Sequence, residues 1–310
     1  MSLAERIRDH FTERLLADAV FQVAPGHLSG LRVARADGSV KAGFVLPFRA
    51  RAVAPSFDRP NVTDPAALEE AIAQAKKSLR LSSGTAALLV PEASVRVFVL
   101  NVDSFPGSGK ERDAFIRWRV GKMMPVIPDD ARIDYAATPG RGPRQVIVAM
   151  ARQVVVWEYE ALFEKAGLKP VAVTAPSLAL ANVVRRAGPV SGLLLNLEEE
   201  TLTLLALSGA GWTLYRQKDV GSSSGTGADE RAETIVREAE NTLRFLEDKE
   251  RAGVDRIWFR SSVAAEWPAL AARLKERIPL PVMPVEYEAP EVWTEAHRAV
   301  LAPLVGQALR

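Results

Sequence analysis

Residues 190–220 read VSGLLLNLEEETLTLLALSGAGWTLYRQKDV. Two short apolar runs, 192–197 and 201–207, and a third strand-like segment, 211–218, are separated here by segments of turn length. Short apolar runs bounded by turn residues predict β-strands, so this stretch predicts three consecutive strands joined by tight turns. A second stretch near the beginning of the chain has the same form. This duplication is the strongest signal of organisation in the sequence.

The earlier three-strand unit is predicted over 20–23, 30–35 and 40–46, with Asp37-Gly38 as a hairpin-turn signal. Each unit is followed by alternating helix and strand patterns, which are typical of an α/β architecture. The expected helices are 68–79 with Asp64 or Thr63 as its cap, 110–122, 153–166 ending at Gly167, one opening at Pro176 with Thr174 as its cap, 229–250, one within 264–277, and one from Thr294. The further expected strands are 86–90, 95–100, 133–138, 145–150, 171–174, 254–259 and 282–285.

The composition of the 310 residues is that of a folded soluble protein of about two domains. The absence of cysteine excludes disulfides and Cys-ligated metals, and three scattered histidines do not predict a metal site. No apolar run reaches the ~20 residues of a membrane span, so we expect a cytoplasmic protein. Residues 1–189 carry a net charge of +7 and residues 190–310 a net charge of −5. No basic run is interleaved with aromatic residues, so nucleic-acid binding is not expected.

Three short motifs suggest ligands, and each also has a purely structural interpretation. Residues 106–110 resemble a phosphate-binding loop, but Glu111 follows the lysine where a hydroxyl is required, so we interpret them as a linker that caps the next helix. Residues 222–227 are either a phosphate-binding loop before a helix or a flexible Ser/Gly connection. Glu198–Glu200 are either cation ligands or, as we favour, the solvated tip of a hairpin.

Residues 115–128, FIRWRVGKMMPVIP, are the most unusual stretch. A helix carrying Phe115 and Trp118 runs into an apolar extension between Pro125 and Pro128. One interpretation is that Phe115, Trp118, Met123 and Ile127 fill a core. The other is a peptide groove, with apolar anchors and arginines at its rim.

At this point the sequence resembles the PilM family of type IV pilus assembly proteins and, more distantly, the cytoplasmic part of the type II secretion protein GspL. The resemblance spans roughly residues 19–310. It rests on residues 95–100 with 115–127 and 133–135, on 146–151 with 159–173 (ending in a Gly-Leu-Lys-Pro stretch), and on the closing stretch 302–310. It implies a bilobed actin-like fold, a duplicated ribonuclease H-like unit, with an α/β subdomain of about 102–172 inserted in the first lobe. The expected domains are an N-terminal helix in 1–18, a first lobe over 19–189 and a shortened second lobe over 190–310.

The resemblance also implies a nucleotide site between the lobes, and this sequence departs from it at every expected motif. The two Asp-x-Gly turns fall on Gln22 and Ala24 and on Asn196 and Glu198, and the adenosine turn falls on Ser261 and Ser262. Amides cannot replace carboxylates that organise Mg²⁺ near phosphates. We therefore expect no cofactor, no metal and no catalysis: a pseudo-ATPase.

The function implied is a cytoplasmic scaffold of a type IV pilus or related secretion machine, held at the inner membrane through its partners. Its expected partner is the cytoplasmic N-terminal tail of a PilN-like bitopic membrane protein, with self-association or contact with an assembly ATPase as further partners. The expected partner-binding residues are Arg117, Trp118, Met123, Pro125 and Ile127.

Two alternatives remain open. One is a divergent ATPase that holds ATP and Mg²⁺ through backbone amides near Gly26, Gly221 and Gly225. The other is a membrane-surface adaptor that uses a basic N-terminal helix, in which Leu3, Ile7, Phe11 and Leu15 share one face.

Overall fold

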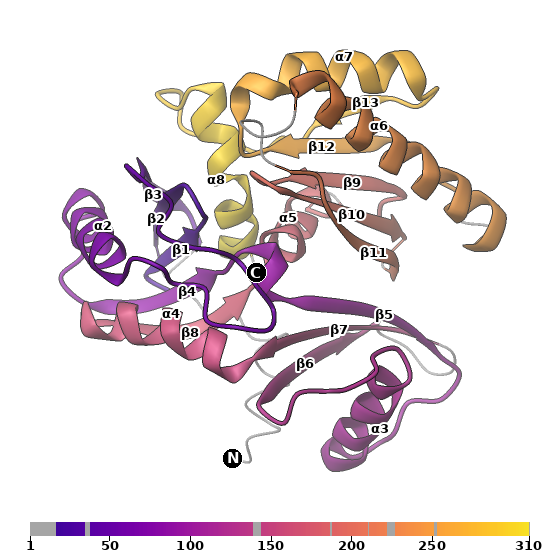
Figure 1. Ribbon diagram of the computed structural model, residues 1–310, viewed down its shortest axis with the longest axis horizontal. Coiled ribbons are helices and arrows are strands. Elements are labelled where there is room, and N and C mark those ends of the chain that lie inside the picture. Colours follow the sequence, from indigo (N-terminus) through magenta and orange to yellow (C-terminus); the bar gives the residue numbers. More distant parts are fainter. Residues whose placement is uncertain are drawn as a thin grey trace.

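The computed structural model describes residues 17–34, 38–138, 144–186, 188–209, 211–221, 227–250 and 253–309. The predicted N-terminal helix, nearly all of the turn at 139–144 and nearly all of the Ser/Gly loop lie outside these residues. The chain is a mixed α/β protein with two lobes, each built on a five-stranded sheet, and a third, smaller sheet beside them (Figure 1). The bilobed actin-like fold predicted from the sequence is confirmed.

The first sheet has the strand order β3-β2-β1-β4-β8. Its strands are β1 (Ala19–Val23), β2 (His27–Val33), β3 (Val40–Pro47), β4 (Gly84–Leu89) and β8 (Leu168–Thr174). The meander β1–β3 is antiparallel, and β4 and β8 add parallel to β1. Helices α2 (Pro65–Ser78) and α4 (Gln153–Lys165) bury their apolar faces on this sheet. The Asp64 side chain caps α2, as predicted, by accepting from the Ala67 amide.

The second sheet repeats this topology, with the order β11-β10-β9-β12-β13. Its strands are β9 (Gly192–Leu197), β10 (Thr201–Ser208), β11 (Gly211–Asp219), β12 (Ile257–Ser261) and β13 (Val282–Pro284). Helices α6 (Ala228–Phe245), extended by a π-helical turn at Leu246–Glu250, and α7 (Trp267–Arg277) pack on it. The identical strand order confirms the duplication that residues 190–220 predicted.

The third sheet is built from β5 (Arg96–Val102), β6 (Ala131–Ala137) and β7 (Arg144–Arg152), in the order β5-β7-β6. Helix α3 (Gly109–Gly121) packs on it through Ile116 and Val120. Ser108 and Glu111 form a reciprocal capping box at the start of α3, so the capping role predicted for residues 106–110 is confirmed.

Two helices, α5 (Pro176–Val184) and α8 (Glu295–Ala308), lie between the large sheets (Figure 1). Helix α8 packs on β1, β2 and β3, although it follows the strands of the second sheet in sequence. Helix α5 packs on α8 and also contributes Leu180 and Ala181 to a cluster on the second sheet. The prediction that Thr174 caps α5 is wrong. The N-cap is Ala175, and the carboxylate of Glu92 accepts from the Ser177 amide instead.

Candidate functional site

The lost nucleotide positions meet where the strands of the two lobes end. Gln22 and Ala24 at the end of β1 line a small cavity of about 90 Å³ together with Glu198, which follows β9. Asn196 lies beside them on β9, fully buried. Ser261 pairs with Leu197 at the end of β12, and the Ser262 amide donates to the Leu197 carbonyl. The sequence therefore identified residues that the fold brings together.

Four of the side chains in this region form one buried network, which we call the cleft network: Gln22, Asn196, Glu198 and Arg260. The Gln22 amide nitrogen donates to the Glu198 carboxylate over 3.1 Å, from the first lobe to the second. The Arg260 guanidinium donates to the Asn196 side-chain oxygen over 2.9 Å and also to Glu198. Arg260 is only 2% exposed and Glu198 7% exposed. Arg260 was not among the residues predicted from the sequence.

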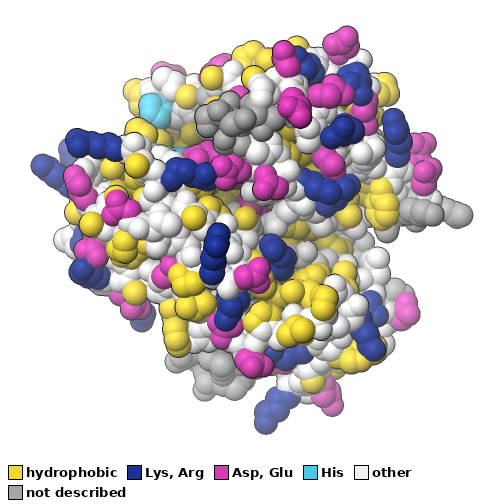
Figure 2. Space-filling view, in the orientation of Figure 1, with side chains coloured by type: hydrophobic (Ala, Val, Ile, Leu, Met, Phe, Trp, Pro, Cys, Tyr) yellow, Lys and Arg dark blue, Asp and Glu magenta, His cyan; other side chains and the backbone are white. Residues whose placement is uncertain are grey.

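The interpretation of Glu198–Glu200 as a solvated hairpin tip is wrong, because the first lobe covers this turn. Glu199 accepts from the Gly26 amide over 2.9 Å, and one of its oxygens lies 3.9 Å from His27 Nδ1. Glu200 accepts two hydrogen bonds, of 2.6 and 2.8 Å, from the Arg51 guanidinium. Acidic side chains with basic ones beside them gather along this junction (Figure 2). The turn therefore joins the basic lobe to the acidic one.

The cavity that these residues line is smaller than a nucleotide-sized site. Sites for ligands of this size measure roughly 300–1,000 Å³, against about 90 Å³ here. Glu92, Glu198, Glu199 and Glu200 line the cavity, so anionic phosphates would face carboxylates. Of the amides suggested for ATP, that of Gly26 is bonded to Glu199 and that of Gly221 to Asp219, while Gly225 lies outside the described residues. Among the described residues no group of three His, Asp or Glu is placed to share a metal ion.

Glu92, to which no sequence pattern pointed, connects three parts of the fold. One carboxylate oxygen accepts from the Ser177 amide of α5 over 2.5 Å, and the other accepts from the Tyr215 hydroxyl of β11 over 2.5 Å. The Gln217 amide donates to the Glu92 backbone carbonyl over 2.8 Å. Burial raises the pKa of the Glu92 carboxyl, although its hydrogen bonds to Ser177 and Tyr215 oppose that shift.

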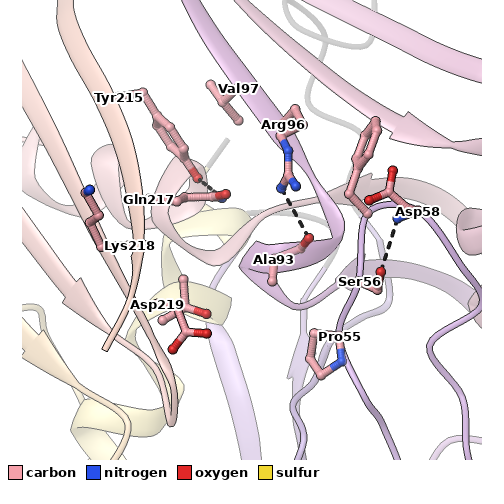
Figure 3. A pocket seen from close by; sticks show the side chains of 12 residues that line it. Pro55, Ser56, Asp58, Ala93, Arg96, Val97, Tyr215, Gln217, Lys218 and Asp219 are labelled. Atoms are coloured by element: carbon pink, nitrogen blue, oxygen red, sulfur yellow. Dashed lines mark hydrogen bonds between the residues drawn. The ribbon is translucent and has the colours of Figure 1, made fainter. Parts of the chain in front are cut away.

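A larger cavity of about 510 Å³ opens beside Glu92 (Figure 3). Its walls come from residues 55–58, the beginning of β5 and the end of β11. Arg96 lies over the Phe57 ring at 4.8 Å and faces the cavity from one wall, with Lys218 and Asp219 on the opposite one. The partner-binding residues predicted from the sequence line neither this cavity nor the smaller one.

Those residues instead lie at the end of α3 and just beyond it, and all of them except Ile127 are exposed. We call this strip the α3 surface: Arg117, Trp118, Met123, Pro125, Val126 and Ile127. Trp118 is 56% exposed, Met123 55% and Val126 74%. Lys122 lies over the Trp118 ring, and Arg117 donates to the Ala131 carbonyl. The interpretation of Trp118 and Met123 as core is therefore wrong, whereas Ile127 packs partly buried against the core of the small sheet.

A second exposed apolar pair lies on α4. Trp157 is 55% exposed and Val154 37% exposed, on the face of the helix opposite the buried Val155 and Tyr159. Asp130 accepts from the Val154 amide, so the first turn of α4 adjoins the segment that follows the α3 surface. The three-residue spacing of Val154 and Trp157 was the available signal, but buried and exposed faces cannot be told apart when both are apolar.

The duplicated sheets, with two helices between them, define a bilobed actin-like protein, and solved structures of that class resemble it. A chain of the PilM–PilN type IV pilus biogenesis complex matches over 96% of this chain and 99% of its own, with a TM-score of 0.76 at 18% identity. The ethanolamine utilization protein EutJ from Carboxydothermus hydrogenoformans matches over 99% of both chains, with a TM-score of 0.54 at 11% identity. The cytoplasmic domain of EpsL, an inner membrane component of the type II secretion system of Vibrio cholerae, matches over 94% of both, with a TM-score of 0.50 at 13% identity.

These likenesses establish the fold, and the resemblance to PilM and GspL inferred from the sequence is confirmed at that level. Neither a protein-family model nor a curated protein sequence matches the chain. In the described part of the chain, no helix is both long enough and apolar enough to cross a bilayer.

Proposed function

We propose that this protein is a non-catalytic cytoplasmic scaffold in the inner-membrane assembly platform of a type IV pilus or a related secretion machine. The observation that carries the proposal is the cleft itself: side chains of the protein fill the place where the fold would hold a nucleotide. The structural likeness to a chain of a PilM–PilN complex supports the assignment to this machinery. The protein would lie at the membrane through its partners.

The proposed partner is the cytoplasmic tail of a PilN-like membrane protein, bound at the α3 surface. An exposed Trp beside exposed Met and Val side chains is a large apolar area that folding leaves uncovered. Pro125 and Pro128 fix the backbone of this strip, so little conformational entropy is lost when a peptide docks. Arg117 and Lys122 at its edge would orient acidic groups of the tail more than they would add affinity.

Trp118→Ala is expected to weaken binding of the tail peptide about 30-fold, equivalent to roughly 2 kcal/mol, with an unchanged melting temperature. The reason is that an exposed anchor contributes to binding but little to folding. Calorimetric titration and a thermal melt of the same variant measure the two effects.

Trp157→Ala is the matched control, because it removes an equally exposed tryptophan from α4. It is expected to bind the tail as tightly as the wild type. If Trp157→Ala loses affinity and Trp118→Ala does not, the tail docks on α4 and the α3 surface is the wrong site.

The pseudo-ATPase assignment predicts no specific binding of MgATP. The physical reason is the cleft network, which would have to break to admit a nucleotide and would then present carboxylates to its phosphates. A calorimetric Kd at or below about 10 μM, equivalent to roughly −7 kcal/mol, would contradict the assignment and favour the divergent ATPase.

A further inference from the structure

We infer that Arg260 is a built-in occupant of the cleft, a cationic side chain that holds the two lobes together where the fold would otherwise place a ligand. A scaffold function does not require the two lobes to be held in one arrangement, so this inference goes beyond the proposed function. The inference rests on the acceptors that surround the guanidinium group and on where each of them comes from.

The first two acceptors are carbonyl oxygens of α8, those of Ala299 and Val300, and Pro303 explains why the Ala299 carbonyl is available. Proline has no N–H, so Pro303 inside α8 leaves the Ala299 carbonyl without its helical donor, and the proline ring displaces that carbonyl. Arg260 Nε donates to this oxygen over 2.7 Å. Arg260 Nη2 donates to the neighbouring Val300 carbonyl over 3.2 Å. The proline inside α8 thus frees one of the two carbonyl oxygens that bind this edge of the guanidinium.

The other edge of the guanidinium faces the strand ends. Nη1 donates to the Asn196 side-chain oxygen and to the Glu198 carboxylate. Glu198 supplies the opposite charge and accepts from Gln22 of β1 as well. A buried arginine is stable only when its charge is paired and its nitrogens have acceptors. Here Glu198 pairs the charge, and each of the three guanidinium nitrogens has at least one acceptor.

These contacts join parts of the molecule that no continuous sheet connects. Arg260 and Asn196 belong to strands of the second sheet, while α8 packs on the first. Gln22 belongs to the first sheet and reaches Arg260 through Glu198. One side chain therefore ties the second lobe to the first lobe at two places, through α8 and through β1.

The test is rescue of a truncated variant by free guanidinium ion. Arg260→Ala leaves a guanidinium-sized space between Glu198, Asn196 and the two carbonyls, and is expected to lower the melting temperature by about 10 °C. Millimolar guanidinium chloride is expected to restore several degrees, relative to sodium chloride at equal ionic strength. Wild type and Arg273→Ala, which removes a half-exposed arginine paired with Asp229, are expected to gain nothing.

The charge partner is tested in the double variant Arg260→Ala, Glu198→Gln, in which guanidinium rescue is expected to disappear. Should Arg260→Ala not fold, Arg260→Lys supplies the second measurement. A lysine can pair with Glu198 but cannot reach the α8 carbonyls as well, so amide hydrogen exchange at residues 196–201 is expected to rise.

An Arg260→Ala protein that melts like the wild type, one that folds but is not rescued, or an Arg260→Lys protein with wild-type exchange would each overturn the inference. None of these substitutions touches the α3 surface. A failure of tail binding would therefore refute the proposed function and leave this result standing.

Discussion

Gly306→Ala is expected to lower the free energy of unfolding by about 3 kcal/mol. Gly306 lies in α8 where this helix crosses α5, and a Cβ atom there would be 2.1 Å from the Ala179 carbonyl oxygen and 2.7 Å from its carbon. Both are backbone atoms of a buried helix, so they cannot rotate away. The two helices would have to separate, and the hydrogen bond from the Asn182 side chain to the Gly306 carbonyl, 3.0 Å long, would lengthen.

A loss of stability in Gly306→Ala would be informative because it is opposite to the usual effect of this substitution in a helix. In an ordinary helix interior, alanine is more favourable than glycine by roughly 1 kcal/mol. Gly121→Ala in α3 is the matched control, since its new methyl group would meet only the end of the Ile127 side chain at 3.7 Å. Urea denaturation should find Gly121→Ala at least as stable as the wild type. Equal stability of Gly306→Ala and the wild type would show that the crossing can open without cost.

Glu92→Ala is expected to cost about 3 kcal/mol or more of stability. The substitution leaves the Ser177 amide and the Tyr215 hydroxyl buried without their acceptor, and it removes a weaker contact to Gln217. These donors belong to α5 and β11, so the loss is felt at the junction of the lobes. Chemical denaturation measures it directly.

The isosteric variant Glu92→Gln separates the charge of this side chain from its shape. The pKa of Glu92 is raised in the folded protein, so the folded state holds this proton more tightly than the unfolded state, whose pKa is about 4.5. The stability that protonated Glu92 contributes is present below pH 4.5 and is lost as the pH rises through the folded pKa.

The unfolding free energy of the wild type minus that of Glu92→Gln is therefore expected to fall as the pH rises above 4.5. The slope is at most about 1.4 kcal/mol per pH unit, and it ends above the folded pKa. A difference that is constant from pH 4.5 to 8 would show that the pKa of Glu92 is not raised.

The sequence predicted the fold well because short segments of the chain carry the strand pattern of each lobe. The two meanders contain apolar runs between turn residues, and their strand order follows from short connections. What the sequence did not predict depends on contacts between distant residues. Gln22 meets Glu198 across 176 positions, and no local pattern records that contact. For the same reason the turn Glu198–Glu200 was predicted to be solvated, although Glu198 is buried and the other two glutamates bind groups of the first lobe.

The functional residues also divide into those that a sequence pattern identified and those that only the structure identified. Asn196 was identified only as a departure from a resemblance, and Glu198 as such a departure and as part of a run of three glutamates. Neither observation says which group takes the place of the missing carboxylates. Arg260 occupies the place of the missing groups in the cleft. The sequence contained a usable signal for this residue, because it is a charged residue inside the short strand Ile257–Ser261, whose other members are all buried. A lone buried arginine requires acceptors. Only the structure shows that one of them is the Ala299 carbonyl, which Pro303 leaves without a helical donor.

The position of α8 sets an order for folding during synthesis. This helix covers the inner face of the first sheet, yet it follows every other described element in the chain. A ribosome therefore completes both sheets before the segment that seals the first of them has emerged. Vectorial folding usually favours the N-terminal part of a protein, but here the second lobe can acquire its core while Val20, Leu31 and Leu89 still face water. The inner face of the nascent first lobe therefore stays uncovered until α8 has emerged.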